Sequence, residues 1–188
     1  MSVTGSNAVT VNIDRKSSSF THTVVFSFGS YSKTTTGVGT SASYTIPQSW
    51  LNAIPSSTSG TAKVTVTTYS GSTKIGAAVS KSFTVTVPAS VVPTISSVAI
   101  ADTVTAVYSF FGNMVQSKSK PKFTITAAGA LSSTIKTYKT VFEGKSYSGA
   151  TPTAGVITGS GTVSAKITVT DSRGRSASTT KTWTVLPY

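Results

Sequence analysis

The stretch Phe83-Thr-Val-Thr-Val-Pro88-Ala-Ser-Val-Val-Pro93-Thr-Ile-Ser-Ser-Val98 decides how the chain is divided. A strand-like alternation of apolar and polar residues stops at Pro88 and starts again after Pro93. Each proline removes a backbone donor and pushes the residue before it toward an extended conformation, so a short, stiff connector should lie between them. The pattern predicts two domains, residues 1–90 and 91–188, with a hinge at about residues 88–93.

Serine and threonine supply most of the polarity of the chain. There are 33 Ser and 35 Thr, whereas only 11% of the residues are charged. Threonine is β-branched and favours pleated, half-buried surfaces. Each half, at about 90 residues, has the size of an immunoglobulin or fibronectin type III domain. The fold class predicted is therefore all-β, with two tandem immunoglobulin-like or fibronectin III-like β-sandwiches.

Period-two alternation predicts the strands of the first domain. From residue 20 the even positions form an apolar face that should point inward, namely Phe20, His22, Val24, Phe26 and Phe28. Further strands are expected at 9–13, 43–46, 60–69 and 81–87, with a polar loop at 31–37. Prolines bracket residues 48–54, which should form one or two helical turns with Trp50 as a core plug rather than a ring that stacks on sugars.

The second domain should contain seven strands, at 95–100, 104–110, 122–127, 135–142, 155–158, 164–170 and 178–185. Glu143-Gly144 should form a tight hairpin turn between two of them. The last hairpin repeats the first domain: Lys63-Val-Thr-Val-Thr aligns with Lys166-Ile-Thr-Val-Thr, and Phe83-Thr-Val aligns with Trp183-Thr-Val. A shared terminal hairpin supports a tandem of sandwich modules, with Phe26 and Trp183 as core rings.

Residues for catalysis are scarce. The four acids, Asp14, Asp102, Glu143 and Asp171, all fall at predicted turns, where Asp caps the backbone and Glu meets water. No two of them are expected to converge as glycoside hydrolysis requires. The single histidine lies on an inward face and should be buried rather than catalytic or metal-bound. No Gly-x-Ser-x-Gly elbow or phosphate loop occurs, so we expect no enzyme and no cofactor.

The chain is basic and has no cysteine, which excludes disulfides and thiolate metal sites. The net charge is +12, of which residues 1–90 carry +5 (six basic minus one acidic) and residues 91–188 carry +7 (ten basic minus three acidic). This charge permits binding to nucleic acid or to an anionic cell surface. The first residues lack an export-signal pattern, and no stretch approaches the ~18 apolar residues of a membrane span. We expect a soluble protein without membrane insertion.

Five basic residues are the candidates for contact with a polyanion: Lys118, Lys120, Lys122, Arg173 and Arg175. The three lysines share one parity and should form an outward row, beside Pro121, at the edge of a sheet. Edge lysines commonly prevent aggregation, and this reading is favoured over a polyanion site. Interleaved aromatic residues, which RNA-binding sheets use, are missing here, so nucleic acid is disfavoured. The two arginines should meet solvent in a hairpin loop.

Several stretches resemble a family of tail structural proteins of siphophages from Gram-positive bacteria, grouped as siphovirus proteins of unknown function. In the first half these stretches are Ser19–Gly29, Thr36–Ser41, Ile46-Pro47, Ile54-Pro55 and Tyr69–Gly76. In the second half they are Val115–Lys120, Thr124–Gly129, Ser133–Lys136 and Thr168–Arg175.

The resemblance implies a virion protein that is assembled in the host cytoplasm and works in the tail, baseplate or fibre. Such a module would space, decorate or attach, with other phage tail proteins and further copies of itself as partners. The alternative is an adhesin domain that binds a carbohydrate or an anionic wall polymer, such as host cell-wall polysaccharide or teichoic acid. The family has no catalytic motif to carry over onto these residues.

Overall fold

The computed structural model describes residues 2–188 and divides into two compact units, one ending at Ser90 and the other starting at Val91. The last strand of unit 1 ends at Thr86, and the first strand of unit 2 begins at Thr94. Both prolines of the connector, Pro88 and Pro93, lie in the intervening segment, which forms neither strand nor helix.

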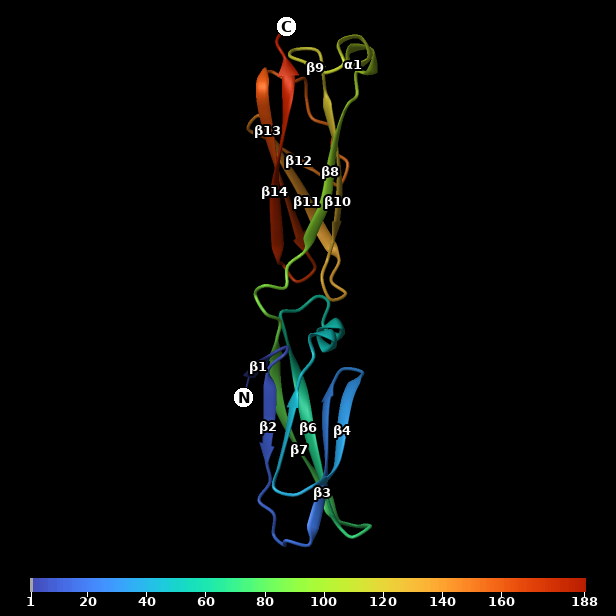
Figure 1. Cartoon of the computed structure of the whole chain (residues 1–188), viewed down its shortest axis with the longest axis vertical. Coiled ribbons are helices and arrows are strands. Elements are labelled where there is room, and N and C mark those ends of the chain that lie inside the picture. The colour runs from blue at the N-terminus through green and yellow to red at the C-terminus, as the bar shows by residue number, and fades with distance from the viewer. Residues whose placement is uncertain (1) are drawn as a thin grey trace. The chain divides into compact units, whose positions relative to one another are not determined.

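Unit 1 is a β-sandwich made of a five-stranded and a two-stranded sheet (Figure 1). The larger sheet has the order β1-β7-β6-β3-β4, and its strands are β1 (Ser2–Thr4), β7 (Thr73–Thr86), β6 (Ser59–Ser70), β3 (Phe20–Phe28) and β4 (Tyr31–Val38). The smaller sheet pairs β2 (Ala8–Asn12) with β5 (Ser41–Thr45). All pairings are antiparallel except that of β1, which runs parallel to the end of β7.

The core of unit 1 follows the predicted alternation along β3. The even positions from His22 to Phe28 are buried between the sheets, and Phe20 is half-buried at the strand's start. The proline-bracketed segment forms a short 3₁₀ helix, η1 (Gln48–Ala53), which buries Trp50 and Leu51. The ring of Trp50 lies against Tyr31 and Tyr44, at centroid distances of 6.0 and 5.4 Å. Trp50 is a core residue, as predicted.

The prediction of a loop at 31–37 is wrong, because these residues form most of β4. This strand is the edge of its sheet, and residues 32–37 are exposed. An edge strand exposed on both faces needs no apolar alternation, so its sequence lacks the pattern that marks a core strand. Three consecutive threonines still favour an extended backbone there.

Unit 2 is a second sandwich, in which a two-stranded sheet faces a five-stranded one (Figure 1). The smaller sheet pairs β8 (Thr94–Asp102) with β10 (Pro121–Ala128). The larger sheet has the order β12-β11-β13-β14-β9, and its strands are β12 (Lys145–Ser148), β11 (Ile135–Phe142), β13 (Gly161–Asp171), β14 (Ser176–Leu186) and β9 (Met114–Val115). The chain is thus all-β, with two tandem β-sandwiches, as predicted.

Aromatic rings fill the centre of the unit 2 core. Phe123 and Phe142 are buried and contact each other edge-to-face at a centroid distance of 6.1 Å. Trp183 packs against both rings, at 5.9 and 5.2 Å, but its side chain is only half-buried. The prediction that Trp183 belongs to this core is confirmed, while Phe123 is the more deeply buried ring.

Two of the predicted strands of unit 2 are wrong. Residues 104–110 lie in a short helix, α1 (Thr105–Phe111), which ends at Gly112 in the left-handed conformation. Its valine and aromatic residues favour a strand by composition, but α1 buries none of its side chains. Residues 155–158 also form no strand. They form an irregular segment in which Ile157 is buried and the other three residues are exposed.

Some of the many hydroxyl side chains form pairs across the outer faces of both units. Directly opposite Thr and Ser side chains lie within hydrogen-bond distance on neighbouring strands: Thr10 and Ser43 at 2.6 Å, Thr65 and Ser80 at 2.8 Å, Thr168 and Ser178 at 2.8 Å, and Thr170 and Ser176 at 2.7 Å. Such cross-strand pairs stabilise a sheet without charge. No helix in residues 2–188 is long and apolar enough to cross a membrane.

Candidate functional site

The three predicted lysines are exposed at one end of unit 2, but they do not form a single row on one strand. Only Lys122 belongs to β10, whereas Lys118 and Lys120 lie in the turn that leads from β9 to it. Asp102 fixes this turn, because its Oδ1 accepts hydrogen bonds from the backbone N–H groups of Lys120 (3.0 Å) and Val104 (2.9 Å). The backbone that carries Lys120 is therefore held by a buried carboxylate.

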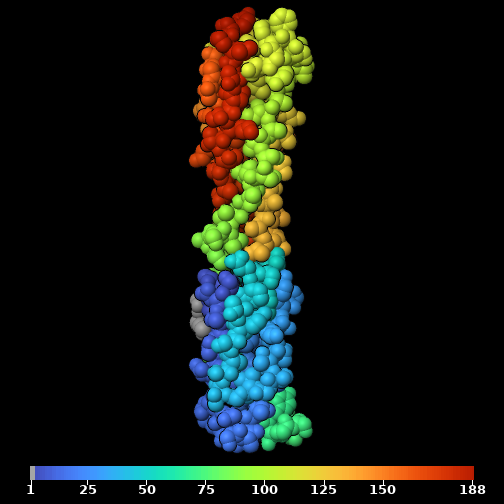
Figure 2. Space-filling model, viewed as in Figure 1, coloured from blue at the N-terminus to red at the C-terminus, as the bar shows by residue number. Residues whose placement is uncertain are grey.

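The structure adds exposed aromatic side chains to these lysines. The ammonium of Lys118 lies 4.0 Å from the ring centroid of Tyr188, a cation–π contact. The helix α1, which packs beside β9, exposes Tyr108, Phe110 and Phe111, and Phe110 is 82% exposed. Figure 2 shows α1, in yellow-green, at the surface of unit 2. We name this surface, formed by Tyr108, Phe110, Phe111, Lys118, Lys120 and Tyr188, the aromatic–basic end.

Sequence reasoning missed the aromatic part of this surface, because it assigned residues 104–110 to a core strand. One signal could have corrected it: Gly112 directly follows two phenylalanines and suits the left-handed C-cap of a helix. Exposed rings and ammonium groups side by side can stack on sugar rings and attract anionic groups.

The expectation that both arginines meet solvent is wrong for Arg173, which is only 7% exposed. Its guanidinium donates hydrogen bonds to the carbonyl oxygens of Ala130 (2.6 Å) and Leu131 (2.7 Å). The pKa of Arg173 is lowered overall from its ordinary value, chiefly because the guanidinium is buried. The Asp171 carboxylate acts in the opposite direction, and the nearby charge of Arg175 lowers the pKa further. Arg173 thus holds the loop that contains Ala130 and Leu131. Arg175, in the same turn as Arg173, is half-buried.

Asp171 organises the same turn from the other side. Its Oδ1 accepts hydrogen bonds from the backbone N–H groups of Arg173 and Arg175, both at 2.9 Å. Its Oδ2 accepts a third from the hydroxyl of Ser133, also at 2.9 Å. A buried carboxylate with three donors is a structural anchor, in agreement with the predicted capping role of Asp171.

Glu143 corrects another expectation, since its carboxylate does more than meet water. With Gly144 it forms the predicted tight turn, in which both residues have positive φ (46° and 73°). Its Oε1 accepts hydrogen bonds from the N–H groups of Thr158 (2.9 Å) and Gly159 (2.8 Å). Glu143 thereby ties down the irregular segment before β13. The four acids serve separate turns, and no group of three or more His, Cys, Asp or Glu in residues 2–188 could hold a metal ion.

The histidine of unit 1 is buried, as predicted. The Nδ1 atom of His22 lies within hydrogen-bond distance of two carbonyl oxygens, those of Val38 (3.1 Å) and Gly39 (2.9 Å). A ring held in this way by β4 and the following residue is a packed core group. His22 also borders a pocket on its other side.

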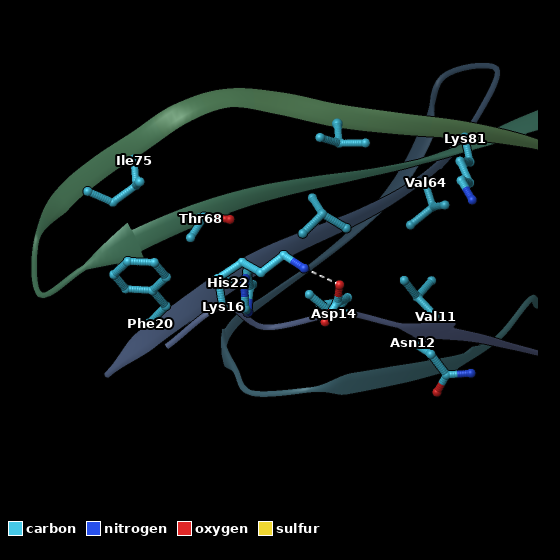
Figure 3. A pocket seen from close by; sticks show the side chains of 13 residues that line it. Val11, Asn12, Asp14, Lys16, Phe20, His22, Val64, Thr68, Ile75 and Lys81 are labelled. Atoms are coloured by element: carbon cyan, nitrogen blue, oxygen red, sulfur yellow. Dashed lines mark hydrogen bonds and ion pairs between the residues drawn. The ribbon is translucent and has the colours of Figure 1, made fainter. Parts of the chain in front are cut away.

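That pocket, of about 440 Å³, lies between the two sheets of unit 1 (Figure 3). One wall comes from β2 and the turn after it, and the other from β3, β6 and β7. Its lining is mostly apolar: Val11, Ile13, Phe20, Val64, Val66, Ile75 and Val79, together with Asn12, His22 and Thr68. Three charged residues, Asp14, Lys16 and Lys81, complete it, and Lys16 pairs with Asp14. We name it the β2–β7 groove.

Comparison with solved structures gives only weak likenesses. An amphioxus IgVJ-C2 molecule matches at 12% identity and a TM-score of 0.48, over 99% of both chains. Fibronectin(III)-like modules of Clostridium thermocellum CbhA match at 14% identity and a TM-score of 0.37, over 99% of this chain and 89% of that one. The PKD1 domain of Vibrio anguillarum Epp matches at 17% identity and a TM-score of 0.39, over 52% of this chain and 96% of that one.

No curated protein sequence matches the chain. A family model described as "Siphovirus protein of unknown function (DUF859)" matches residues 2–188. The match spans both units and the connector between them.

Proposed function

Because this chain belongs to a family of siphovirus proteins of unknown function, we propose that it is a structural module of the phage virion. In this proposal it works in the tail, baseplate or fibre of a phage of Gram-positive bacteria, where it spaces, decorates or attaches. It is assembled in the host cytoplasm with other tail proteins and with further copies of itself.

The observation that carries this proposal is the family match across two self-contained sandwiches. Each unit has its own buried core, and the match leaves out no described residue. Small sandwiches joined by a short connector suit a part that sets distances within an assembly. The acids and the histidine have structural partners at turns and in the core, which supports a non-enzymatic role.

The test is to locate the chain in the particle. Virions purified through a density gradient should contain it in a fixed ratio to the major tail protein, as measured by quantitative mass spectrometry. Gold-labelled antibodies against the chain should then mark one place on the tail in electron micrographs. A chain found in the infected-cell lysate, but missing from purified virions, would contradict the proposal.

A second candidate function is attachment to an anionic polymer of the host wall, and the aromatic–basic end favours it. The ammonium of Lys118 lies over the Tyr188 ring there, and an anionic wall polymer that carries sugar substituents offers both phosphate groups and sugar rings to such a pair. Binding to purified walls should then survive ~0.3 M salt in part, because ring contacts are not screened, whereas purely ionic attraction falls off within about 6 Å. Binding that disappears at that salt would favour the purely structural role.

Charge reversal would locate such a site. Replacing Lys118, Lys120 and Lys122 by Glu should abolish wall binding if these lysines make the contact. The matched control reverses three exposed lysines on the five-stranded sheet, Lys136, Lys139 and Lys166, so the change in net charge is the same. Equal loss in both variants would mean that overall charge alone attracts the wall. Unchanged binding would show that these lysines do not contact the wall, and would leave only Lys122, on β10, as a protector of a sheet edge.

A further inference from the structure

The β2–β7 groove is bordered by two strand edges that carry no neighbour among the described residues. On one side, the part of β7 from Thr73 to Phe83 pairs only with β6, because β1 reaches no further than Thr84–Thr86. On the other side, β2 pairs only with β5. The open part of β7 spans eleven residues, or about 35 Å of strand.

The floor of the groove is a continuation of the core face. Val66 lies directly opposite Val79, and Thr68 lies opposite Ile75, so these side chains share the face that carries buried Phe83 further along β7. Val79 remains 64% exposed and Ile75 39% exposed. The two-stranded sheet thus leaves uncovered a strip of apolar side chains that a third strand beside β2 would bury.

The edge of β7 carries only part of the protection that such edges normally have. Protection uses lysines, prolines or bulges along the edge. Here a bulge occurs near Gly76, where the register with β6 shifts between Val66 and Thr68, and lysines occur only at the two ends, Lys74 and Lys81. The residues from Ile75 to Ser80 carry no charge and include no proline, so the backbone remains open to pairing.

The charged residues around the β2–β7 groove indicate which kind of segment would bind in it. Unit 1 has six basic residues and one acid, and that acid, Asp14, is already paired with Lys16 beside the groove. Lys81 lies at the other end of the lining. A second copy of this chain offers no acidic segment of this kind, because its four acids, at positions 14, 102, 143 and 171, lie far apart in the sequence. A segment with acidic residues would be attracted, and alternate apolar residues would fill the floor.

We propose that the β2–β7 groove binds an extended segment of another protein, apolar at alternate positions and acidic between them, as an added β-strand. Main-chain hydrogen bonds to the open edge of β7 or of β2 would hold the segment, and the apolar floor would select its side chains. This inference does not depend on the proposed place in the virion. It requires only that a partner chain presents such a segment.

The test uses the full chain and a synthetic peptide of about nine residues, with valine at every second position and Glu or Thr between. NMR of the labelled chain should show shifts and slowed amide exchange on β7 or β2 along the groove. A peptide with one central Thr replaced by Pro, which removes a donor and breaks the strand, should not bind. A peptide with Lys in place of Glu should bind at least about tenfold more weakly.

Two neighbouring substitutions separate the floor from the opposite face of β7. Val79→Asn removes an apolar contact and should weaken peptide binding about tenfold. Ser80→Asn, on the other face, is the matched control and should change binding less than twofold, by about the error of the method. Both residues are exposed, so neither change should unfold the protein.

Three results would overturn the proposal. The first is a complete lack of shifts along β7 and β2 at millimolar peptide. The second is binding through side chains of the floor without slowed amide exchange on either edge, which would indicate a site for small apolar ligands. The third is self-association of the chain, measured by sedimentation, that covers the same residues and excludes the peptide.

Discussion

The last hairpin of each unit has the same sequence pattern, but the turn between its two strands is held differently in the two units. In unit 2 the turn between β13 and β14 is anchored by Asp171, and Arg173 holds the neighbouring loop. In unit 1 the turn between β6 and β7 has no comparable anchor, and residues 71–82 are all exposed. In Figure 2 this turn, coloured green, lies at the surface of unit 1. The shared pattern specifies the hairpin, while a few buried polar groups decide whether its end is fixed.

The loop that Arg173 holds shows why an anchor is needed there. Leu131 and Ser132 both have positive φ, 48° and 64°, which costs energy for residues other than glycine. The guanidinium binds the carbonyl of Leu131 and that of the residue before it. Unit 2 therefore uses buried polar contacts to hold a strained loop, whereas unit 1 leaves an apolar groove beside its hairpin.

Each unit has its own core, and the largest expected effect tests whether the two cores are independent. Phe26→Ala should destabilise unit 1 by ~3–5 kcal/mol, and Phe123→Ala should destabilise unit 2 by a similar amount, because both rings are fully buried. Calorimetry of the full chain should show each change in one unfolding transition only. Phe110→Ala, on the exposed face of α1, is the control and should cost less than ~0.5 kcal/mol.

If both substitutions shift a single common transition, the two units unfold together and their cores are not independent. Expression of residues 1–90 and 91–188 as separate chains would then decide the matter. Cooperative unfolding of each piece would show that each unit folds by itself. A disordered piece would show that its fold depends on the other unit.

The second prediction concerns the anchor of unit 2. Asp171→Ala should cost about 2–4 kcal/mol, since two backbone donors and the Ser133 hydroxyl lose their acceptor in a buried place. Asp14→Ala removes the exposed acid of unit 1 and should cost less than about 0.5 kcal/mol. Denaturant unfolding measures both. An effect of Asp171→Ala as small as that of Asp14→Ala would show that Asp171 does not anchor the turn of unit 2.

The smallest effect is expected at the open hairpin. Val79→Ala should change the free energy of unfolding by less than ~0.5 kcal/mol, because this side chain is mostly exposed. Val169→Ala, in the buried part of β13, should cost about 2 kcal/mol by the same measurement. A cost at Val79 as large as that at Val169 would mean that the groove is closed in solution.

Local pattern predicted the buried face of β3, the 3₁₀ helix between prolines and most of the repeated hairpins, but it started the second strand of the unit 1 hairpin at residue 81, whereas β7 begins at Thr73. These features depend on neighbouring residues, through period-two alternation and the fixed φ of proline. The errors at β4, α1 and residues 155–158 have another origin. Each concerns a segment with few buried side chains, where tertiary context decides the backbone and local propensity misleads.

The site residues also divide into those whose environment follows from neighbouring residues and those whose environment depends on contacts distant in the sequence. The exposure of Lys122 followed from parity along β10, whereas the burial of Arg173 depends on carbonyl groups more than forty residues away, at Ala130 and Leu131. Glu143 likewise reaches Thr158 across the unit. No local pattern contains such contacts. The β2–β7 groove could not be predicted from the sequence either, because it depends on which strand edges stay unpaired.

The parallel pairing of β1 with β7 has a mechanical consequence. Ser2, Val3 and Thr4 lie beside Thr84, Val85 and Thr86, close to the two ends of unit 1. A pull on those ends would slide the two strands past each other and load the bonds between them together rather than one after another. In unit 2 the first strand, β8, is antiparallel to β10, and the parallel strand β9 lies inside the chain. Under tension, measured by single-molecule force spectroscopy, we expect unit 1 to yield at the higher force.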